Sequence, residues 1–405
     1  MSEYLIQGET LANIARQTNS LVGKSDRITP HTMIENLSYA NGEVVKQSDL
    51  LTRCLLLMSN QSQAALLNAI TDRTVYAVSL DNVTGIGERV FQYCPNLTSV
   101  SFPQATTIGP GAFQYCSKLT SVSFSQVTTI GYSAFASCSN LTSVNFPLAT
   151  TIGSSAFDRC SSLTSVSFPE VITIGEAAFS SCSSLTTVSF PQATTIGKHA
   201  FTGARILATV DFPVATTIDA NAFNDCYKLT SADFPQVTTI GSRAFCSCSS
   251  LTSVNFPLAT TIGEEAFDRC PNLTTVDFPL ATTIGTSAFW RCTNLTTADF
   301  PQATTISSYA FRSCRSLTSV SFPAATTIGF SAFNSCISLT SIYLGASSVC
   351  TLDHSNAFLS AGITSTTGSI FVPTSLVAAY QSATNWVYFS NRIFALEDNV
   401  TVNGG

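Results

Sequence analysis

The chain has 405 residues, which is enough for two or three ordinary domains or for one long array of repeats. Charged residues make up only 10% of the chain, against about 25% in a typical soluble protein, and the net charge is −6. The sequence has no basic stripe and no apolar stretch long enough to cross a bilayer, so we expect neither nucleic-acid binding nor membrane insertion. The hydrophobic share of 45% is ordinary, which argues against a disordered chain.

Residues 1–74 differ from the rest of the chain and predict a helical module. Thr10 is a candidate N-cap for a helix over 11–17, and Pro30 falls near the first turn of a second helix. Residues 49–58 are apolar nearly all round, so a helix there should be buried. It would either cap the first repeat or join two copies of the chain into a homo-oligomer.

About the first 40 residues resemble an N-terminal module of phage minor structural and tail-fibre proteins. The resemblance rests on Leu5-Ile6-Gln7-Gly8-Glu9-Thr10-Leu11, then Gly23-Lys24-Ser25-Asp26 and Ile28-Thr29-Pro30, followed by Met33. It implies attachment to other virion proteins through residues 1–74. The start of the sequence has no basic and then apolar stretch, so we expect no secretory signal. Lysis of the host would release a phage protein without one.

A 22-residue repeat occupies residues 75–345. Leucine recurs at this interval without a slip, and Val75 fills the preceding place. The leucines are Leu97, Leu119, Leu141, Leu163, Leu185, Leu207, Leu229, Leu251, Leu273, Leu295, Leu317 and Leu339. A strict repeat of this length indicates stacked, nearly identical units.

The residue pattern of one repeat predicts the path of the chain around one coil. Residues 97–102 alternate between apolar and polar and predict a short strand that ends at Pro103, and the chain can bend tightly at Gly109. The pair at 112–113 and Cys116 have the spacing of one short helical turn facing inward. A single coil cannot bury this set, whereas stacked coils can. We therefore predict an α/β solenoid of about 12 coils, with a parallel β-sheet on one face and short helical turns on the other.

The array resembles the BspA-like (Treponema-type) class of leucine-rich repeat proteins. The run I-G-x-x-A-F-x-x-C-x-x-L, typical of that class, extends from Ile130 to Leu141 and again from Ile262 to Leu273. The resemblance implies a leucine-rich repeat fold and a binding scaffold whose partners vary. It leaves the ligand open.

Residues 346–405 predict a degenerate coil and a C-terminal cap. The Ala-Phe pair returns at 357–358, displaced by three residues, and 369–373 repeats the strand pattern. Thr374 is a candidate N-cap for a helix through about Trp386. Residues 372–396 resemble the terminal module that often closes BspA-like arrays.

Eleven cysteines occupy one slot of the repeat. They are Cys94, Cys116, Cys138, Cys160, Cys182, Cys226, Cys248, Cys270, Cys292, Cys314 and Cys336. Their side chains should project in parallel, which disfavours disulfide geometry, and Ala204 fills the same slot, so the position selects a small apolar side chain. We expect buried thiols, no metal site and no cofactor. Cys246 lies outside this ladder and is expected to be exposed.

The sequence carries no recognisable catalytic constellation. His31, His199 and His354 are scattered over different segments, and no nucleophile, phosphate-binding or dinucleotide motif is present. We expect no catalytic residues and no enzyme. A depolymerase would require a pair of acids in a groove, and only the polar column described next offers acids close together.

Two surfaces are candidates for binding. The first is a polar column on the sheet, formed by Asp211, Asp233, Asn255, Asp277 and Asp299. Stacked carboxylates repel, so the column should have raised pKa values or attract a cation, and it could bind sugar hydroxyls. The two x-x pairs of G-x-x-A-F-x-x-C change in almost every coil, and we call the face that carries them the variable face. The second candidate is a patch on this face, formed by Trp290, Arg291, Tyr309 and Phe330, which include residue types that dominate binding hot spots. The alternative for both is a well-hydrated surface without a ligand.

These observations predict a phage virion protein, a tail appendage released by host lysis. The N-terminal module would join the particle. The solenoid would be a rigid scaffold that either contacts a host-surface glycan or protein or has a purely structural role on the head or tail. The alternative is a bacterial cell-surface adhesin of the BspA-like kind that binds a host protein or glycan.

Overall fold

The computed structural model describes residues 77–79, 83–365 and 368–396, so the helices and the phage-type module predicted for residues 1–74 lie outside the described residues. The chain divides into two compact units, Met1–Leu185 and Thr186–Gly405, and each is described by itself. The described coils form a parallel β-solenoid of about 14 turns with a 22-residue repeat, where the sequence predicts about 12 coils.

Each coil contributes a strand of three or four residues, and we call these strands the valine row after their usual central residue. In the first unit they are β1 (Ala77–Ser79), β3 (Ser99–Ser101), β5 (Ser121–Ser123), β7 (Ser143–Asn145) and β9 (Ser165–Ser167). In the second unit they are β11 (Thr187–Ser189), β13 (Thr209–Asp211), β15 (Ser231–Asp233), β17 (Ser253–Asn255), β19 (Thr275–Asp277), β21 (Thr297–Asp299), β23 (Ser319–Phe322) and β25 (Ser341–Leu344). These strands confirm the one predicted from the alternation of apolar and polar residues.

A second strand in each coil, two residues long, forms what we call the isoleucine row. In the first unit the row comprises β2 (Gly85–Ile86), β4 (Thr107–Ile108), β6 (Thr129–Ile130), β8 (Thr151–Ile152) and β10 (Thr173–Ile174). In the second unit it comprises β12 (Thr195–Ile196), β14 (Thr217–Ile218), β16 (Thr239–Ile240), β18 (Thr261–Ile262), β20 (Thr283–Ile284), β22 (Thr305–Ile306), β24 (Thr327–Ile328) and β26 (Thr351–Leu352). The sequence analysis did not predict these strands.

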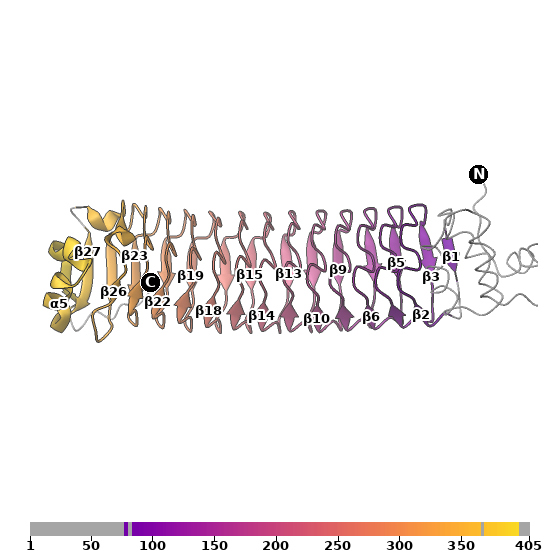
Figure 1. Ribbon diagram of the computed structural model, residues 1–405, viewed down its shortest axis with the longest axis horizontal. Helices are drawn as coiled ribbons and strands as arrows, with labels where there is room; N and C mark the ends of the chain where they lie inside the picture. Colours follow the sequence, from indigo (N-terminus) through magenta and orange to yellow (C-terminus); the bar gives the residue numbers. More distant parts are fainter. Residues whose placement is uncertain (1–76, 80–82, 366–367, 397–405) are drawn as a thin grey trace, which may run out of the picture. The chain divides into compact units, whose positions relative to one another are not determined.

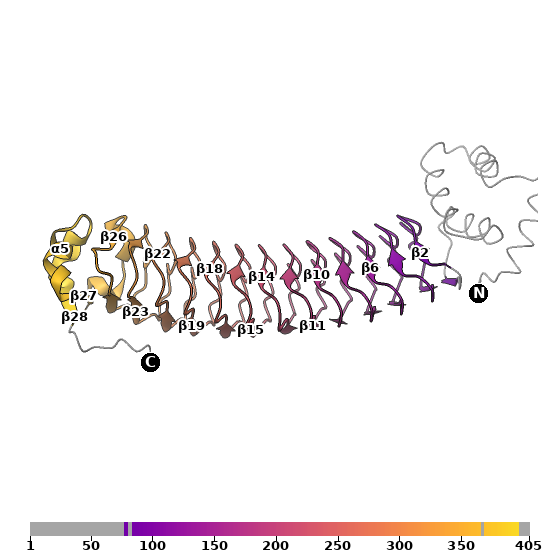
Figure 2. The same ribbon diagram turned by 90° about the horizontal axis from the view of Figure 1, so that it is seen from below.

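Both rows pair in parallel at the period of the repeat. In the isoleucine row of each unit every strand pairs with the equivalent strand of the next coil, as Thr107 does with Thr129. The valine row is interrupted: in the second unit β11 pairs with β13, β15 with β17, and β19 begins a separate run. Within each unit the coils are stacked strand beside strand (Figure 1), and the two rows lie on opposite sides of the coils (Figure 2).

The predicted helical turn is wrong. Residues 131–138, which represent this part of the coil, form two successive turns in which Ser133 and Ser137 have φ values of 51° and 62°. Ser133, Phe135 and Ser137 donate their amides to carbonyls of the next coil at 2.9, 2.7 and 2.7 Å. The amides between them close turns inside the coil. A helix directs its amides to carbonyls of its own chain segment, so it cannot supply this ladder between coils.

Phenylalanine forms two stacked columns in the core of each unit. Phe113 and Phe135 stack at 5.2 Å between ring centroids, and Phe124 and Phe146, from the other column, stack at 5.5 Å. The two columns meet at a tilt, as Phe113 and Phe124 do at 42°. Offset and tilted ring pairs contribute about 0.5–1.5 kcal/mol beyond the burial of their area.

The threonines that flank the strands have a structural role that was not predicted. Thr252 Oγ1 donates to the Thr230 carbonyl of the preceding coil at 3.0 Å, and Thr106 Oγ1 donates to the Thr84 carbonyl at 3.0 Å. The pattern recurs through both units. Each such hydroxyl adds a hydrogen bond along the stacking direction.

We expect Thr252→Val to lower the free energy of unfolding by about 0.5 kcal/mol, because valine keeps the shape of the side chain but loses one partly solvated hydrogen bond. Urea titration of the purified chain measures this change. Thr252→Ser, which retains the hydroxyl, serves as the control. A valine variant as stable as the parent would show that the hydroxyl bond makes no net contribution.

The cysteines of the shared slot are buried thiols without disulfides, as predicted for Cys116 to Cys336. They also donate a hydrogen bond that was not predicted: Cys138 Sγ lies 3.1 Å from the Phe113 carbonyl of the preceding coil. Burial raises the pKa of the Cys138 thiol to about 12. The prediction that Cys246 is exposed is wrong, since only 8% of this residue is accessible.

The last residues of the second unit depart from the repeat. They form η1 (Ser355–Phe358), η2 (Gly362–Thr364), β27 (Ser369–Pro373), η3 (Thr374–Leu376), α5 (Val377–Ser382), η4 (Trp386–Arg392) and β28 (Ile393–Leu396). The return of the Ala-Phe pair is confirmed, because Phe358 stacks on Phe333 at 5.7 Å. The single helix through Trp386 is wrong: α5 ends at Ser382, and Asn385 adopts a φ of 65° before η4 begins.

Two buried aromatic side chains hold this terminal segment against a neighbouring loop. The Tyr380 hydroxyl accepts a hydrogen bond from the Cys350 amide at 2.8 Å, and Trp386 Nε1 donates to the Cys350 carbonyl at 2.6 Å. Thr374, the predicted N-cap, makes no capping bond; its hydroxyl donates to the Leu396 carbonyl. The segment therefore depends on the tertiary contacts of its aromatic residues.

Candidate functional site

The second unit carries a groove on the face formed by the turns that follow the bend of each coil, which we call the turn face. The groove has a volume of about 610 Å³. It is lined by Tyr227, Ser247, Ser249, Arg269, Pro271, Arg291, Thr293, Ser313 and Arg315. These residues alternate between two slots of the repeat, so the groove runs across several consecutive coils.

The lining of the groove is positively charged, in a chain whose net charge is −6. Arg269, Arg291 and Arg315 contribute guanidinium groups, and none of the lining residues is acidic. The remaining polar groups of the lining are hydroxyls. Guanidinium groups only donate hydrogen bonds, and they match the geometry of carboxylate, sulfate and phosphate.

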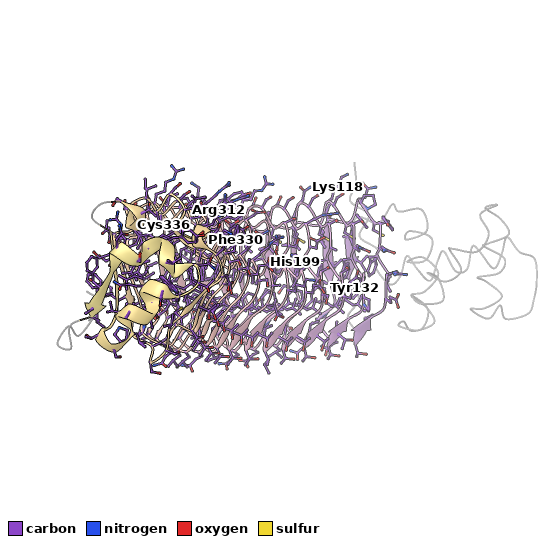
Figure 3. The ribbon with its side chains drawn as sticks, turned by 60° about the vertical axis from the view of Figure 1, so that its left-hand side comes forward. Lys118, Tyr132, His199, Arg312, Phe330 and Cys336 are labelled. Atoms are coloured by element: carbon purple, nitrogen blue, oxygen red, sulfur yellow. The ribbon has the colours of Figure 1, made fainter. Side chains whose placement is uncertain are left out.

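One edge of the groove continues into the predicted aromatic patch. The Arg291 guanidinium lies 4.9 Å from the centre of the Trp290 ring, and Arg312 lies 5.5 Å from both Trp290 and Tyr309. Tyr309 contacts Phe330 edge to face at 5.4 Å. The four residues predicted for the variable face are therefore brought together, with Arg312 as the link that was missed. Figure 3 labels Arg312 and Phe330.

The Trp290 side chain is half-buried. Its slot directly follows the core residue Phe289. The arginines beside it are held over the ring by cation–π contacts. Of the two arginines over the Trp290 ring, Arg291 also lines the groove.

The polar column on the sheet is broken into separate pairs. Ser189 Oγ donates to Asp211 Oδ2 at 2.8 Å, and Asn255 Nδ2 donates to Asp233 Oδ1 at 2.8 Å. Asp277 and Asp299 are register partners on β19 and β21, so two carboxylates lie side by side there. Burial raises the pKa of Asp299, and the neighbouring Asp277 raises it further. The direction agrees with the predicted rise in pKa at Asp299.

We expect Asp299→Asn to stabilise the protein at neutral pH by less than about 1 kcal/mol, because it removes a disfavoured charge near the surface. The folded state raises the pKa of Asp299 above the ordinary value of 3.8, so its contribution to stability falls as pH rises through that window. The gain should accordingly shrink near pH 4. Thermal unfolding at both pH values measures it, with Asp211→Asn as control. An equal gain at both pH values would contradict the assignment.

Comparisons with known proteins agree with this architecture. The family model described as "BspA type Leucine rich repeat region" matches residues 75–163, 150–273 and 238–364. The chain belongs to the BspA-type leucine-rich repeat family. In this repeat the core residues recur from coil to coil, whereas residues of the turn face differ between coils.

Solved structures of other leucine-rich repeat proteins are similar in fold. A leucine-rich repeat protein from Bacteroides ovatus is 23% identical, with a TM-score of 0.63, over 80% of this chain and 85% of that one. A leucine-rich cell surface protein from Faecalibacterium prausnitzii is 23% identical, with a TM-score of 0.42, over 79% and 87%. No curated protein matches the chain. In the described residues no helix is long and apolar enough to cross a membrane.

The family match favours the alternative interpretation, a bacterial repeat protein of the surface type, over the predicted phage virion protein. None of these comparisons supports a phage-type module or a virion location. The sequence analysis also missed Arg269, Arg315 and Tyr227 as groove residues. Sorting all arginines by their slot in the repeat would have placed Arg269 and Arg291 in one column.

Proposed function

We propose that this BspA-type protein is a non-enzymatic binding protein of a bacterial cell surface and that its turn face attaches to an acidic polymer. The observation that carries the proposal is the groove with three arginines and no acidic lining residue. The proposal corresponds to the adhesin alternative and gives its ligand a chemical class.

The arrangement of the arginines favours a polymer over a small anion. Arg269 and Arg291 occupy the same slot of consecutive coils, and consecutive coils in a parallel sheet are spaced by about 4.8 Å. Arg315 belongs to the following coil and extends the positive charge along the stacking direction. A chain molecule with acidic groups on successive units can contact all three guanidinium groups at once.

The hydroxyl groups of the groove suit the uncharged parts of such a polymer. Ser247, Ser249, Thr293 and Ser313 can donate or accept hydrogen bonds, which matches sugar hydroxyls. Tyr227, at 37% exposure, offers an aromatic surface at one end. An acidic polysaccharide, which carries both acidic groups and many hydroxyl groups, can therefore hydrogen-bond more of the lining side chains than an acidic peptide can.

The proposal is tested by binding of the purified full chain to sulfated dextran and to uncharged dextran of equal length. We expect binding to the sulfated polymer that weakens steadily with added salt, because exposed ion pairs are screened within about 8 Å at 0.15 M ionic strength. Uncharged dextran should not bind at the same concentrations. Equal binding to both polymers, or to neither, would overturn the proposal.

A further inference from the structure

Three potential metal ligands lie close together in the second unit: Cys246, Glu265 and Asp268. Cys246 and Asp268 occupy the same slot of consecutive coils, and Cys246 Sγ lies 3.9 Å from Asp268 Oδ2. One ligand atom from each of the three residues lies within 4.8 Å of the others. Cys246 is 8% exposed and Asp268 is 3% exposed, so the cluster is largely removed from solvent.

Asp268 carries an unsatisfied oxygen. Among the described residues, its Oδ1 is the buried side-chain oxygen or nitrogen that has no hydrogen-bond partner. A buried carboxylate oxygen without a partner is costly, since the group has lost its hydration without a replacement. Such an atom indicates a position where an additional positive group would be stabilising.

Asp158 occupies the slot of Asp268 in a coil of the first unit, and its carboxylate finds a hydrogen-bonding partner there without a ligand. It also follows a core phenylalanine, and its neighbouring arginine, Arg159, lies at 3.7 Å, much as Arg269 lies 3.6 Å from Asp268. In the next coil Asp158 has a hydrogen-bonding partner, Ser180, whereas the same place beside Asp268 holds Trp290. Ala136 stands where Asp268 has Cys246, so the preceding coil offers Asp158 no thiol in that slot.

The surrounding arginines leave room for a cation. Arg243 Nε donates to Glu265 Oε2 at 2.6 Å, which engages one of the two oxygens of that carboxylate. Arg269 Nε, at 3.6 Å, is beyond hydrogen-bond distance from Asp268 Oδ2. Both arginine side chains are more than half exposed and can turn toward solvent.

We propose that Cys246, Glu265 and Asp268 form a three-ligand site for a zinc-class divalent cation. A cysteine sulfur and two carboxylate oxygens all belong to the ligand set of Zn²⁺, and the sulfur disfavours Mg²⁺ and Ca²⁺. Binding deprotonates the thiol and releases the proton to solvent. Water fills the fourth position. Zinc–sulfur and zinc–oxygen bonds of about 2.3 and 2.0–2.2 Å require only small side-chain rotations from the present distances.

The test uses the full chain, freed of metal with a chelator and titrated with Co²⁺. We expect one cobalt ion per chain, a thiolate-to-cobalt charge-transfer absorption, and loss of that absorption when Zn²⁺ is added. Cys246→Ser should abolish the absorption, and Asp268→Asn should weaken cobalt binding by at least about tenfold, because even outer-shell partners contribute 10–100-fold.

Asp158→Asn is the matched control and should bind cobalt as the parent does. Zinc should also raise the melting temperature of the parent and of this control, but not that of Asp268→Asn, a readout that remains usable if Cys246→Ser folds poorly. The proposal is overturned if the parent shows no charge-transfer absorption, or if Cys246→Ser retains it. It is equally overturned if Asp158→Asn weakens cobalt binding, relative to the parent, by as much as Asp268→Asn does.

Discussion

Phe267→Ala is expected to lower the free energy of unfolding by about 3–5 kcal/mol, because it removes a large side chain from a closely packed core. The ring is fully buried. It stacks on Phe245 at 5.4 Å and on Phe289 at 5.3 Å. It also contacts Phe256 and Phe278 of the other column at 6.1 and 6.0 Å. Removing it opens a cavity and ends four ring contacts at once.

Urea unfolding, followed by circular dichroism, measures this loss. Each coil contacts mainly its neighbours. The unfolding transition should therefore also broaden, because the coils on either side of the cavity become less tightly coupled. Phe267→Leu is the matched variant: it keeps most of the volume and should cost clearly less. An alanine variant as stable as the leucine variant would show that the phenylalanine columns do not stabilise the stack.

Arg291→Ala is expected to weaken binding to sulfated dextran by roughly 10–100-fold, because a hydrogen bond to a charged group contributes about 1.5–3 kcal/mol. Arg291 is the middle arginine of the groove and is held in place over the Trp290 ring. Its removal leaves two separated guanidinium groups. The slope of affinity against salt concentration should fall as well, because fewer charges contact the polymer.

The repeat offers a control for this substitution. Arg159 occupies the same slot in the first unit with a 71% exposed side chain, and it does not line the groove. Arg159→Ala changes the net charge equally and should leave binding unaltered. Asp233→Ala changes the polar column on the sheet and should also leave binding to sulfated dextran unaltered. Equal losses for Arg159→Ala and Arg291→Ala would mean that binding depends on overall charge and not on the groove.

The 22-residue period was sufficient to predict the core and the slot of each residue. Leu97 and its equivalents, the two phenylalanines and the cysteine slot, which holds Ala204 in one coil, are all buried, as their regular recurrence indicates. A recurring apolar side chain indicates burial because each coil covers the next with the same side chains, whereas the equally regular threonines are mostly exposed. The family likewise follows from the I-G-x-x-A-F-x-x-C-x-x-L pattern.

The turns after the bend could not be predicted from spacing. Ala134, Phe135 and Cys138 have helical spacing, yet Ser133 and Ser137 are left-handed and are not glycines. Such conformations cost about 1–3 kcal/mol each and persist only where the surroundings enforce them. Here the amide ladder to the next coil enforces them, and that ladder exists only in the stacked structure. Local preference therefore pointed to the wrong conformation.

The sequence by itself determined the repeat, the inward-facing residues and the presence of a variable face, because a strict period transmits one burial pattern to every coil. Only the tertiary structure decided which variable residues meet. Cys246 and Asp268 are 22 positions apart in sequence, and Arg269, Arg291 and Arg315 belong to three different coils, so their proximity depends on register and side-chain direction across coils. The burial of Cys246 and the unsatisfied oxygen of Asp268 have the same origin: each is created by the coil packed against it.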